Sequence, residues 1–534
     1  MLHDPFLMKD MDKAVERLDR AIAQDEKILI YGDYDVDGTT AVSLLYKYLK
    51  HHCNSDNLEY YIPDRYTEGY GVSIKGIDYA AENGFSLMLI TDCGIKAVEK
   101  VKYANSRQVD IIICDHHTPG DTLPEAIAVL DPQRPDCPYP YKWLSGCGVS
   151  FKLVQAHSLK HNLPMSELYK LLDLLCVSIA SDIVPITGEN RILAYFGLKN
   201  LNREPSKGLL SIIKICGLDK HSITIDDIVF KIGPRINAAG RMRMDENDEN
   251  ASPSGGHAAV ELLIEGNESI AEEFGSVIDA YNQDRKSIDR SVTQEAHDYI
   301  EGNPEMKALK STVIYNPRWM KGIVGIVASR LIETYYRPTV VLTMSNGFVT
   351  GSARSVPGFD LYQAVESCSD LLENFGGHMY AAGLTMRPEN VGEFTRRFNA
   401  YVEENIDPQM LVPQVDIDSE LLFSDITPAF RKDLNRFQPF GPGNTAPVFA
   451  TCGVSNHGDA KLVGMECEHL RMDLMQRQKP NTKIQAIAFQ QPTHYEWVRS
   501  GRPIDVCYQI VENHYRGTVT TQLRIKDIKP VLNR

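Results

Sequence analysis

The feature that most constrains the fold is a series of short apolar runs early in the chain, separated by segments with helical patterns. The apolar runs cover residues 27–31, 87–91, 110–114 and 127–130. Helical patterns lie between them, for example at 39–50 and 73–83. Apolar strands that alternate with helices are typical of a parallel sheet with helices on both faces. We therefore expect the chain to begin with an α/β domain.

The later regions differ in pattern. Residues 150–215 look rich in helix, and the polar, acidic stretch 245–254 is predicted to be a loop. Residues 257–300 lack proline and have strong helical character, which predicts a long helix or helix pair joining two lobes. Residues 311–400 return to an α/β pattern. After Pro408 and Pro413, short runs of β-branched and aromatic residues predict a small β-domain, such as a barrel.

This pattern divides the chain into four predicted segments. They are a parallel-sheet domain at 1–245, a helical linker at 246–305, a smaller α/β domain at 306–408 and a β-barrel domain at 409–534.

Charge composition leaves two interpretations open. The chain has 56 Lys and Arg residues against 71 Asp and Glu residues, a net charge of −15. Because phosphate binding depends on basic surface, this balance alone favours a protein that does not bind nucleic acid. The alternative is a chain that confines its basic groups to a groove and carries acid elsewhere. The motifs below favour the alternative.

Cysteine usage and hydropathy indicate in which cellular compartment the protein works. The eleven cysteines are scattered without a CxxC pair, which argues against a zinc ribbon or a disulfide framework and suits a reducing cytoplasm. The first 20 residues are charged and lack the apolar core of a signal peptide. No apolar run reaches about 18 residues, so we expect no membrane association through a spanning segment.

Acidic groups follow three of the predicted strands. The first strand is followed by Asp33, Asp35 and Asp37, the second by Asp92, and the third by Asp115, His116 and His117. Ligands of a parallel α/β sheet lie at the carboxyl ends of its strands. Carboxylates gathered there repel one another unless cations neutralise them, and carboxylate with imidazole suits Mg²⁺ or Mn²⁺. Two such ions could clamp an in-line phosphoryl displacement.

Simpler interpretations exist for each group. The spacing of Asp33, Asp35 and Asp37 also begins a calcium loop of the EF-hand type, but the twelfth position, which needs Glu, is Leu44. Taken singly, the triple acid would be a solvated turn, Asp92 a helix N-cap, and the histidines one core and one surface residue. Because all follow apolar strands, a shared metal site is favoured.

Four motifs resemble those of the DHH phosphoesterases, in the same order, and their spelling is similar to the RecJ branch. They cover residues 31–38, 91–94, 115–117 and 178–185. The resemblance implies that the metal ligands are Asp35, Asp37, Asp92, His116 and Asp182. It also implies that Asp115 and His117 lie beside the metals, with His117 facing the scissile phosphate. Many relatives have histidine where this chain has Tyr31, so no ligand is expected at that position.

A segment at 231–241 combines small residues with two arginines. Arginine binds phosphate through two parallel hydrogen bonds, and small residues allow close backbone approach. The segment could equally be a tight turn between domains. It looks like the RecJ-type segment in which an arginine reaches the phosphate near the metals, which implies Arg235 first, then Asn237 and Arg241.

Two glycine-rich stretches, 351–355 and 375–378, could present backbone N–H groups to an anion, or could simply be loops. Both resemble the DHH-associated domain, which binds the strand away from the cut. The implied substrate-binding residues are Ser352, Arg354, Ser355, Gly376, Gly377 and His378. Relatives often have histidine at the position of Met320, so no substrate contact is expected there, and the apolar segment 323–331 is predicted to be core.

The C-terminal stretches 435–444 and 513–518 resemble the oligonucleotide-binding (OB) domain that follows in RecJ. Such barrels stack bases on aromatic side chains over a basic groove. The candidates are Phe437, Phe440, Tyr515 and Arg516, although each could be structural.

The resemblance implies an enzyme that uses two divalent ions, Mn²⁺ or Mg²⁺, to degrade single-stranded DNA from its 5′ end to mononucleotides in repair and recombination. A helicase or a single-strand-binding protein would be a suitable partner. Two alternatives stay open: a phosphodiesterase for very short RNA or cyclic dinucleotides, and a non-catalytic DNA-binding scaffold.

Overall fold

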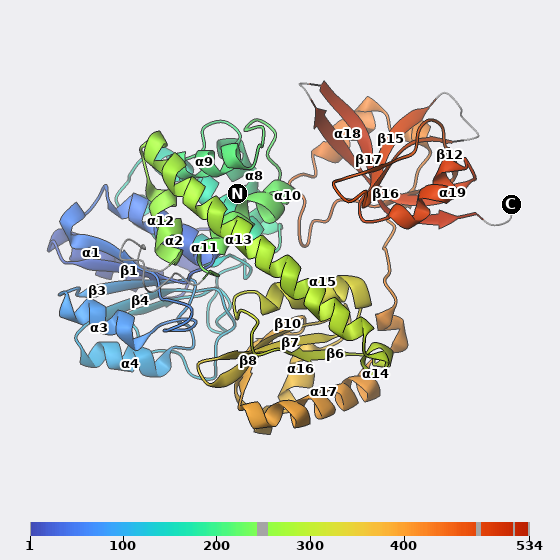
Figure 1. Ribbon diagram of the computed structural model, residues 1–534. Helices are drawn as coiled ribbons and strands as arrows, with labels where there is room; N and C mark the ends of the chain where they lie inside the picture. Colours follow the sequence, from blue (N-terminus) through green and yellow to red (C-terminus); the bar gives the residue numbers. More distant parts are fainter. Residues whose placement is uncertain (1, 243–254, 477–481, 516–517, 532–534) are drawn as a thin grey trace.

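The structure is a computed structural model that describes residues 2–242, 255–476, 482–515 and 518–531. The predicted loop at 245–254 lies wholly outside these residues. Arg516 and the side chain of Tyr515 also lie outside what is described. The chain forms two α/β lobes joined by a long helix and a C-terminal barrel (Figure 1). This confirms the predicted fold class.

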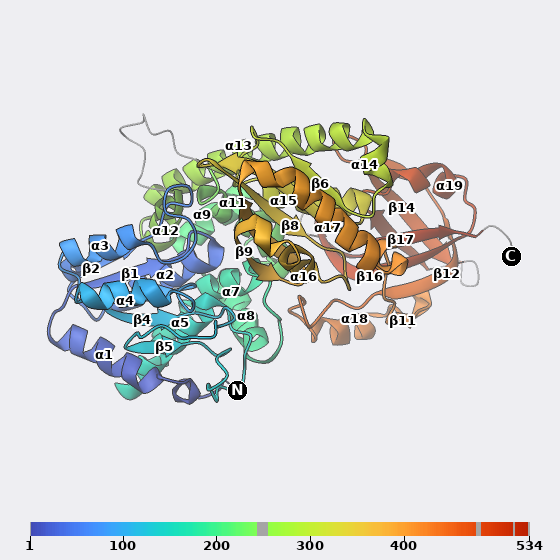
Figure 2. The same ribbon diagram turned by 90° about the horizontal axis from the view of Figure 1, so that it is seen from below.

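The first lobe is built on a five-stranded parallel sheet with the strand order β2-β1-β3-β4-β5. Alternate residues face opposite layers, so Ile28 and Ile30 enter one core while Leu29 and Tyr31 enter the other. Helices α1, α2 and α5 cover the first face, and α3 and α4 cover the second (Figure 2). The strands are β1 (Ile28–Gly32), β2 (Leu58–Tyr61), β3 (Leu87–Thr91), β4 (Asp110–Cys114) and β5 (Ala128–Leu130). The helices are α1 (Met11–Ala23), α2 (Val36–Leu49), α3 (Ile74–Glu82), α4 (Val98–Ser106) and α5 (Gly146–Lys160).

A helical layer follows the sheet and completes the first lobe. It contributes to the same core as α2 and α5, with Leu174, Leu193 and Ile212 among its buried residues. Its helices are α6 (Met165–Tyr169), α7 (Leu172–Ser181), α8 (Gly188–Leu201), α9 (Lys207–Ile215), α10 (Ile225–Asp227), α11 (Gly233–Ala239) and α12 (Gly255–Ile264).

The predicted linker is a helix pair, α12 followed by the long α13 (Glu268–Glu301). Asn267 starts α13 by accepting hydrogen bonds from the backbone N–H groups of Ser269 and Ile270. The first half of α13 buries Ile278 in the core of the first lobe, and its second half buries Val292 against the second lobe. The segment predicted as a linker therefore shares both cores, and the four domain limits given above stay a proposal.

The second lobe has a five-stranded mixed sheet with the order β6-β7-β8-β10-β9. Only β6 and β7 pair in parallel, and the other neighbours are antiparallel. The strands are β6 (Thr312–Tyr315), β7 (Thr339–Ser345), β8 (Phe348–Arg354), β9 (Leu372–His378) and β10 (Ala381–Met386). The helices are α14 (Pro304–Ala308), α15 (Val324–Tyr335), α16 (Leu361–Glu366) and α17 (Val391–Asn405).

The C-terminal domain is a closed barrel. Strands β12, β16, β17, β15 and β14 pair in that order, and β14 pairs back to β12, which closes the ring. The strands are β11 (Ser419–Glu420), β12 (Phe449–Asn456), β13 (Lys461–Val463), β14 (His469–Gln476), β15 (Lys483–Ala488), β16 (Ile504–Tyr515) and β17 (Thr518–Pro530). The helices are α18 (Pro428–Asn435) and α19 (Tyr495–Arg499).

A search of the described residues for a helix with the length and apolar character to cross a bilayer finds none.

Candidate metal centre and substrate-binding surface

The sheet register brings the acidic groups of the first lobe to one edge. Gly32 pairs with Thr91, and Thr91 pairs with Cys114, so the residues that follow these three strands lie side by side. Asp35 then caps α2 by accepting a hydrogen bond from the Gly38 N–H at 3.0 Å. Asp182 reaches the same place from the C-terminal end of α7.

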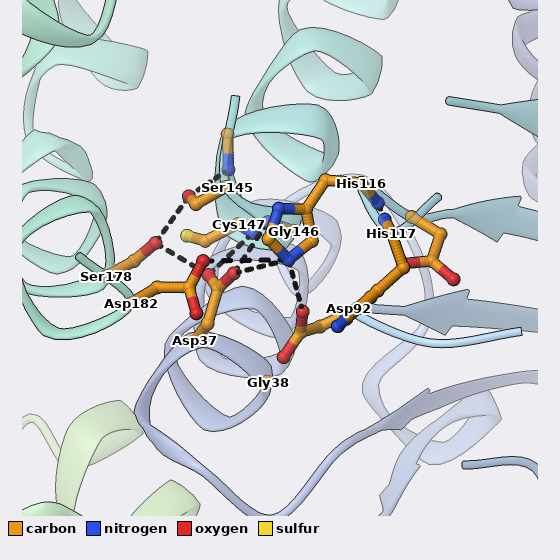
Figure 3. A network of polar contacts seen from close by, with 12 residues as sticks. Asp37, Gly38, Asp92, His116, His117, Ser145, Gly146, Cys147, Ser178 and Asp182 are labelled. Carbon is orange, nitrogen blue, oxygen red and sulfur yellow. Dashed lines mark hydrogen bonds and ion pairs between the residues drawn. The ribbon is translucent and has the colours of Figure 1, made fainter. Parts of the chain in front are cut away.

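His116 lies at the centre of this cluster (Figure 3). Its Nε2 atom is 3.2 Å from Asp92 Oδ1, 3.6 Å from Asp182 Oδ2 and 3.7 Å from Asp37 Oδ2. The same nitrogen is buried and has no hydrogen-bond partner among the described residues. A buried imidazole nitrogen that faces three carboxylates without a hydrogen bond has the arrangement of a metal ligand.

The side chain of Asp37 is fixed by donors from the helical layer. Gly146 N–H donates to its Oδ2 at 2.6 Å, and Cys147 N–H donates to its Oδ1 at 2.9 Å. The Ser178 hydroxyl donates to Oδ1 at 2.6 Å. Because Gly146 and Cys147 open α5, the positive end of that helix holds the carboxylate in place (Figure 3).

The electrostatics of the cluster call for a cation. Burial, and then the charges of neighbouring carboxylates, raise the pKa values of Asp33, Asp92 and Asp182 well above their ordinary range. Burial lowers the pKa of His116, which favours its neutral, ligating form. Two triads, Asp37–His116–Asp182 and Asp33–Asp35–Asp92, each bring their ligand atoms within 4.8 Å of one another. This donor set, carboxylates with one imidazole, fits divalent ions such as Mn²⁺ or Mg²⁺.

Asp115 holds His117 rather than facing the cluster. Its Oδ2 accepts from the Ile95 N–H at 2.9 Å, and its Oδ1 accepts from the His116 N–H at 2.7 Å and meets His117 Nδ1 at 2.7 Å. Burial alone would raise the pKa of Asp115, but these contacts outweigh it and lower that pKa to about 2. Burial likewise opposes the charge on His117, yet Asp115 raises the pKa of His117 to about 9. Asp115 therefore engages Nδ1 of His117, and the other ring nitrogen, Nε2, contacts Tyr70 Oη at 3.1 Å.

The backbone is strained at two points of the cluster. Asp92 has φ 60°, and Ile183, which follows Asp182, has φ 59°. A positive φ is costly for a β-branched residue such as isoleucine and clusters at functional sites.

The sequence analysis did not predict two residues of this site, Gly146 and Tyr70. A Cβ at Gly146 would lie 2.6 Å from Asp92 Cβ, so only glycine allows α5 to approach this carboxylate. The available signal was the pattern Ser145-Gly146-Cys147-Gly148, in which Ser145 caps a helix that begins with small residues. The available signal for Tyr70 was its place between two glycines, Gly69 and Gly71, and the structure gives both of them a positive φ.

The arginines of segment 231–241 have different surroundings. Arg235 Nε donates to Asp279 Oδ1 on α13 at 2.9 Å, so the structure pairs this side chain with α13 and not with the carboxylate cluster. Arg241 donates to the Gly322 carbonyl of the second lobe at 3.2 Å and interacts electrostatically with Asp35. Burial, and then the charge of Arg65, lower the pKa of Arg241 to about 10. Asn237 is half-buried on α11.

The two glycine-rich stretches of the second lobe lie next to each other. Strand β10 pairs on one side with β8, which carries Ser352 and Arg354, and on the other with β9, which ends in Gly376, Gly377 and His378. Burial lowers the pKa of Arg354, whose guanidinium donates to the Ala353 carbonyl at 2.9 Å. Burial and then the charges of His117 and Lys96 lower the pKa of His378, so His378 faces the first lobe near the cluster. Ser355 differs, because its hydroxyl donates to the Phe359 carbonyl at 2.9 Å.

The segment 435–444 packs against the first lobe. Ile186 N–H donates to the Pro442 carbonyl at 2.7 Å, and Arg191 donates to the carbonyls of Arg436 and Phe437. Phe437 is exposed and Phe440 is half-buried, so their predicted stacking role stays a prediction.

Comparisons with known proteins agree with this architecture. A model of the DHH family N-terminal domain matches residues 27–179, a DHHA1 domain model matches 306–404, and a RecJ OB domain model matches 417–527. The single-stranded-DNA-specific exonuclease RecJ of Bacillus subtilis is 36% identical over 98% of this chain, which spans 64% of that relative's length. The RecJ protein of Salmonella typhimurium is 31% identical over 98% of this chain and 91% of its own length.

Solved structures give the same relation. The crystal structure of RecJ in complex with Mn²⁺ from Thermus thermophilus has a TM-score of 0.80 at 26% identity, covering 98% of this chain and 72% of that one. A crystal structure of exonuclease RecJ bound to manganese has a TM-score of 0.62 at 29% identity, covering 76% and 97% of the two chains. With a RecJ relative matched across nearly its whole length and all three domain models in order, this chain belongs to the RecJ family of DHH phosphoesterases.

Proposed function

We propose that the chain is a metal-dependent exonuclease that hydrolyses single-stranded DNA from the 5′ end and releases mononucleotides, in DNA repair and recombination. The observation that carries the proposal is the buried Nε2 of His116, which has no hydrogen-bond partner in the part of the chain that the structure describes and faces carboxylates from three separate motifs. The 5′-to-3′ direction and the repair role fit the family to which the chain belongs.

The ions would be held by the five predicted ligands, Asp35, Asp37, Asp92, His116 and Asp182. When bound, two divalent ions neutralise the charge that develops on the phosphate and supply a nucleophilic water at neutral pH. The protein keeps the ligands in place around them. Asp37 is held by three donors, and Asp35 is fixed as the cap of α2. Such preorganised charge is the main source of stabilisation in phosphoryl transfer.

His117 and Asp115 act on the substrate side. Because Asp115 accepts from Nδ1, the ring of His117 is held with Nε2 outward, where it can donate a hydrogen bond to a phosphate oxygen. Asp115 is a positioning residue, since both its oxygens already accept hydrogen bonds from the protein.

The strand would run between the two lobes, along the basic groups that face the cluster. Arg65 and Arg241 interact with each other electrostatically, and they also interact with Asp33 and Asp35 respectively. Arg354 and His378 continue this surface on the second lobe. A net charge of −15 is compatible with DNA binding because these cations are concentrated beside the site. We place Arg235 in a supporting role, since Asp279 already pairs with it.

Two features of the structure support the exonuclease over the alternatives. A phosphodiesterase for very short RNA or cyclic dinucleotides would have no use for a closed C-terminal barrel, whose preceding segment contacts the first lobe at Ile186. A non-catalytic scaffold would not need five carboxylates and a histidine gathered at one buried point. A helicase or single-strand-binding protein as partner, and a cytoplasmic location suited to eleven scattered cysteines, are further parts of the proposal.

The test is the degradation of single-stranded DNA labelled at its 5′ or 3′ end, with Mn²⁺, Mg²⁺ or EDTA and a duplex control. We expect immediate release of the 5′ label as mononucleotide, only with metal and only from single strands. His116→Ala should abolish release, while His457→Ala, a change at an exposed residue of the barrel, should not. Early release of the 3′ label, or cleavage by His116→Ala, would contradict the proposal, and binding without cleavage would favour the scaffold.

A further inference from the structure

A second histidine–carboxylate cluster lies in the first lobe, away from the carboxylate centre. It consists of Asp19 on α1 and of His157 and His161 at the C-terminal end of α5 (Figure 2 shows both helices). The carboxylate centre touches the other end of α5, through Gly146 and Cys147. At a rise of about 1.5 Å per residue, the eleven residues from Gly146 to His157 separate the two clusters by roughly 16 Å. This cluster plays no part in the proposed chemistry.

The three side chains converge on one oxygen. Asp19 Oδ1 lies 2.8 Å from His161 Nε2 and 3.3 Å from His157 Nε2. The two histidines are four residues apart on one helix face, with ring centroids 4.7 Å apart. The other oxygen of Asp19, Oδ2, is held by Lys160 Nζ at 2.9 Å, which leaves Oδ1 directed at the histidines.

The ring nitrogen of His157 that points away from Asp19 has a hydrogen-bond partner, as in many metal-ligating histidines. This atom, Nδ1, lies 2.7 Å from Tyr48 Oη, and that hydroxyl lies 2.8 Å from Ser158 Oγ. If Nδ1–H donates to Tyr48 and the Tyr48 hydroxyl donates to Ser158, the lone pair of His157 Nε2 faces Asp19. Metal-ligating histidines usually have such a partner on the second ring nitrogen. The ring of His52 lies beside this group, 5.6 Å from that of His157.

We propose that Asp19, His157 and His161 bind a zinc-class divalent ion that fastens α1 to α5. In a tetrahedral site with bonds of about 2.0–2.1 Å, ligand atoms lie about 3.4 Å apart. The separation of 3.3 Å between Asp19 Oδ1 and His157 Nε2 already fits, and all three ligand atoms lie within 4.8 Å of one another.

The ligand chemistry separates this site from the carboxylate centre. Two imidazoles with one carboxylate favour Zn²⁺, Co²⁺ or Ni²⁺, whereas the carboxylate centre suits Mg²⁺ or Mn²⁺. The core around α1 and α5 is shared, because Leu18 and Leu153 are buried in the same cluster. An ion at this position would therefore stabilise the first lobe without contacting DNA.

The test is a calorimetric titration of the full chain with Zn²⁺ in millimolar Mg²⁺, compared across four proteins. These are the wild type, His161→Ala, the matched control His457→Ala, and Asp92→Asn, which removes a predicted ligand of the carboxylate centre. His161 is half-exposed, so its replacement leaves the core intact. We expect His161→Ala to lose one equivalent of Zn²⁺, or to bind it at least tenfold more weakly, while His457→Ala and Asp92→Asn retain it.

A second readout uses Zn²⁺-dependent thermal stability, which should rise in the wild type and in Asp92→Asn but not in His161→Ala. Equal Zn²⁺ binding by wild type and His161→Ala would overturn the proposal, and the cluster would be a hydrogen-bond network. Loss of the equivalent in Asp92→Asn would also overturn it, because the ion would then belong to the carboxylate centre.

Discussion

Replacing Asp92 with asparagine should stabilise the protein in EDTA and disable it as an enzyme. Asp92 is buried, and its pKa is raised by burial and by the charges of Asp37, Asp35 and other carboxylates. Its ligand oxygen lies within 4.8 Å of those of Asp33 and Asp35. At an effective dielectric constant of about 20, two unit charges at that distance repel by about 3.5 kcal/mol. Asparagine has nearly the same shape and carries no charge.

Part of this repulsion is relieved because a carboxyl with a raised pKa takes up a proton. We therefore expect a gain of about 1–3 kcal/mol in EDTA, or a rise of about 2–10 °C in the unfolding temperature of the first lobe. Saturating Mn²⁺ should raise the unfolding temperature of the wild type but not that of Asp92→Asn. Exonuclease activity should fall by at least about a hundredfold, as expected when a group that stabilises developing charge is lost.

The assay is thermal unfolding of both proteins in EDTA and in Mn²⁺, with Asp173→Asn as the matched control. Asp173 is also buried, but it accepts hydrogen bonds from the N–H groups of Leu174 at 2.7 Å and Ser206 at 2.8 Å. Its replacement should cost about 1–3 kcal/mol with or without metal. If Asp92→Asn is destabilised in EDTA as much as Asp173→Asn, the repulsion argument is refuted.

Three further changes test other parts of the account. Gly146→Ala would place a Cβ 2.6 Å from Asp92 Cβ, so its activity should fall about a hundredfold. Gly266→Ala, whose added Cβ meets no described residue within 4 Å, should be neutral in the same assay. Asp115→Asn should lower kcat about 10–100-fold with unchanged Mn²⁺ affinity by calorimetry, because His117 loses its orienting partner; weakened Mn²⁺ binding would instead make Asp115 a ligand. Burial lowers the pKa of His257 from 6.5 to about 4, so the stability it confers is complete above pH 6.5 and is lost as the pH falls towards 4. His257→Phe should remove up to about 3 kcal/mol of that pH dependence in urea unfolding between pH 7 and pH 4, and an unchanged slope would disprove this cause.

The parallel sheet was predictable because its strands carry a strong local signal. The apolar runs at 87–91 and 110–114 coincide with β3 and β4, since both strands are buried on two faces and read as continuous hydrophobic segments. The edge strand β2 was missed, because Leu58–Tyr61 is only partly buried and its sequence alternates less clearly. Residues 257–300, predicted to form a long helix or a helix pair, form the pair α12 and α13.

For the site too, residues placed by local sequence could be predicted, whereas residues placed by long-range packing could not. Asp92, Asp115 and His116 follow strands, so chain order alone places them at one edge of the sheet. The surroundings of Arg235 depend on Asp279, which lies 44 residues later on α13, and no local pattern announces that pair. The close approach of Gly146 to Asp92 is likewise a product of how α5 packs against the sheet.

The central claim, that one buried cluster holds the catalytic ions, is tested most directly by anomalous X-ray diffraction from crystals grown with Mn²⁺. The account predicts anomalous peaks bounded by Asp35, Asp37, Asp92, His116 and Asp182, at Mn²⁺ concentrations that support cleavage of single-stranded DNA. Peaks that lie elsewhere, or none at this cluster under those conditions, would contradict it.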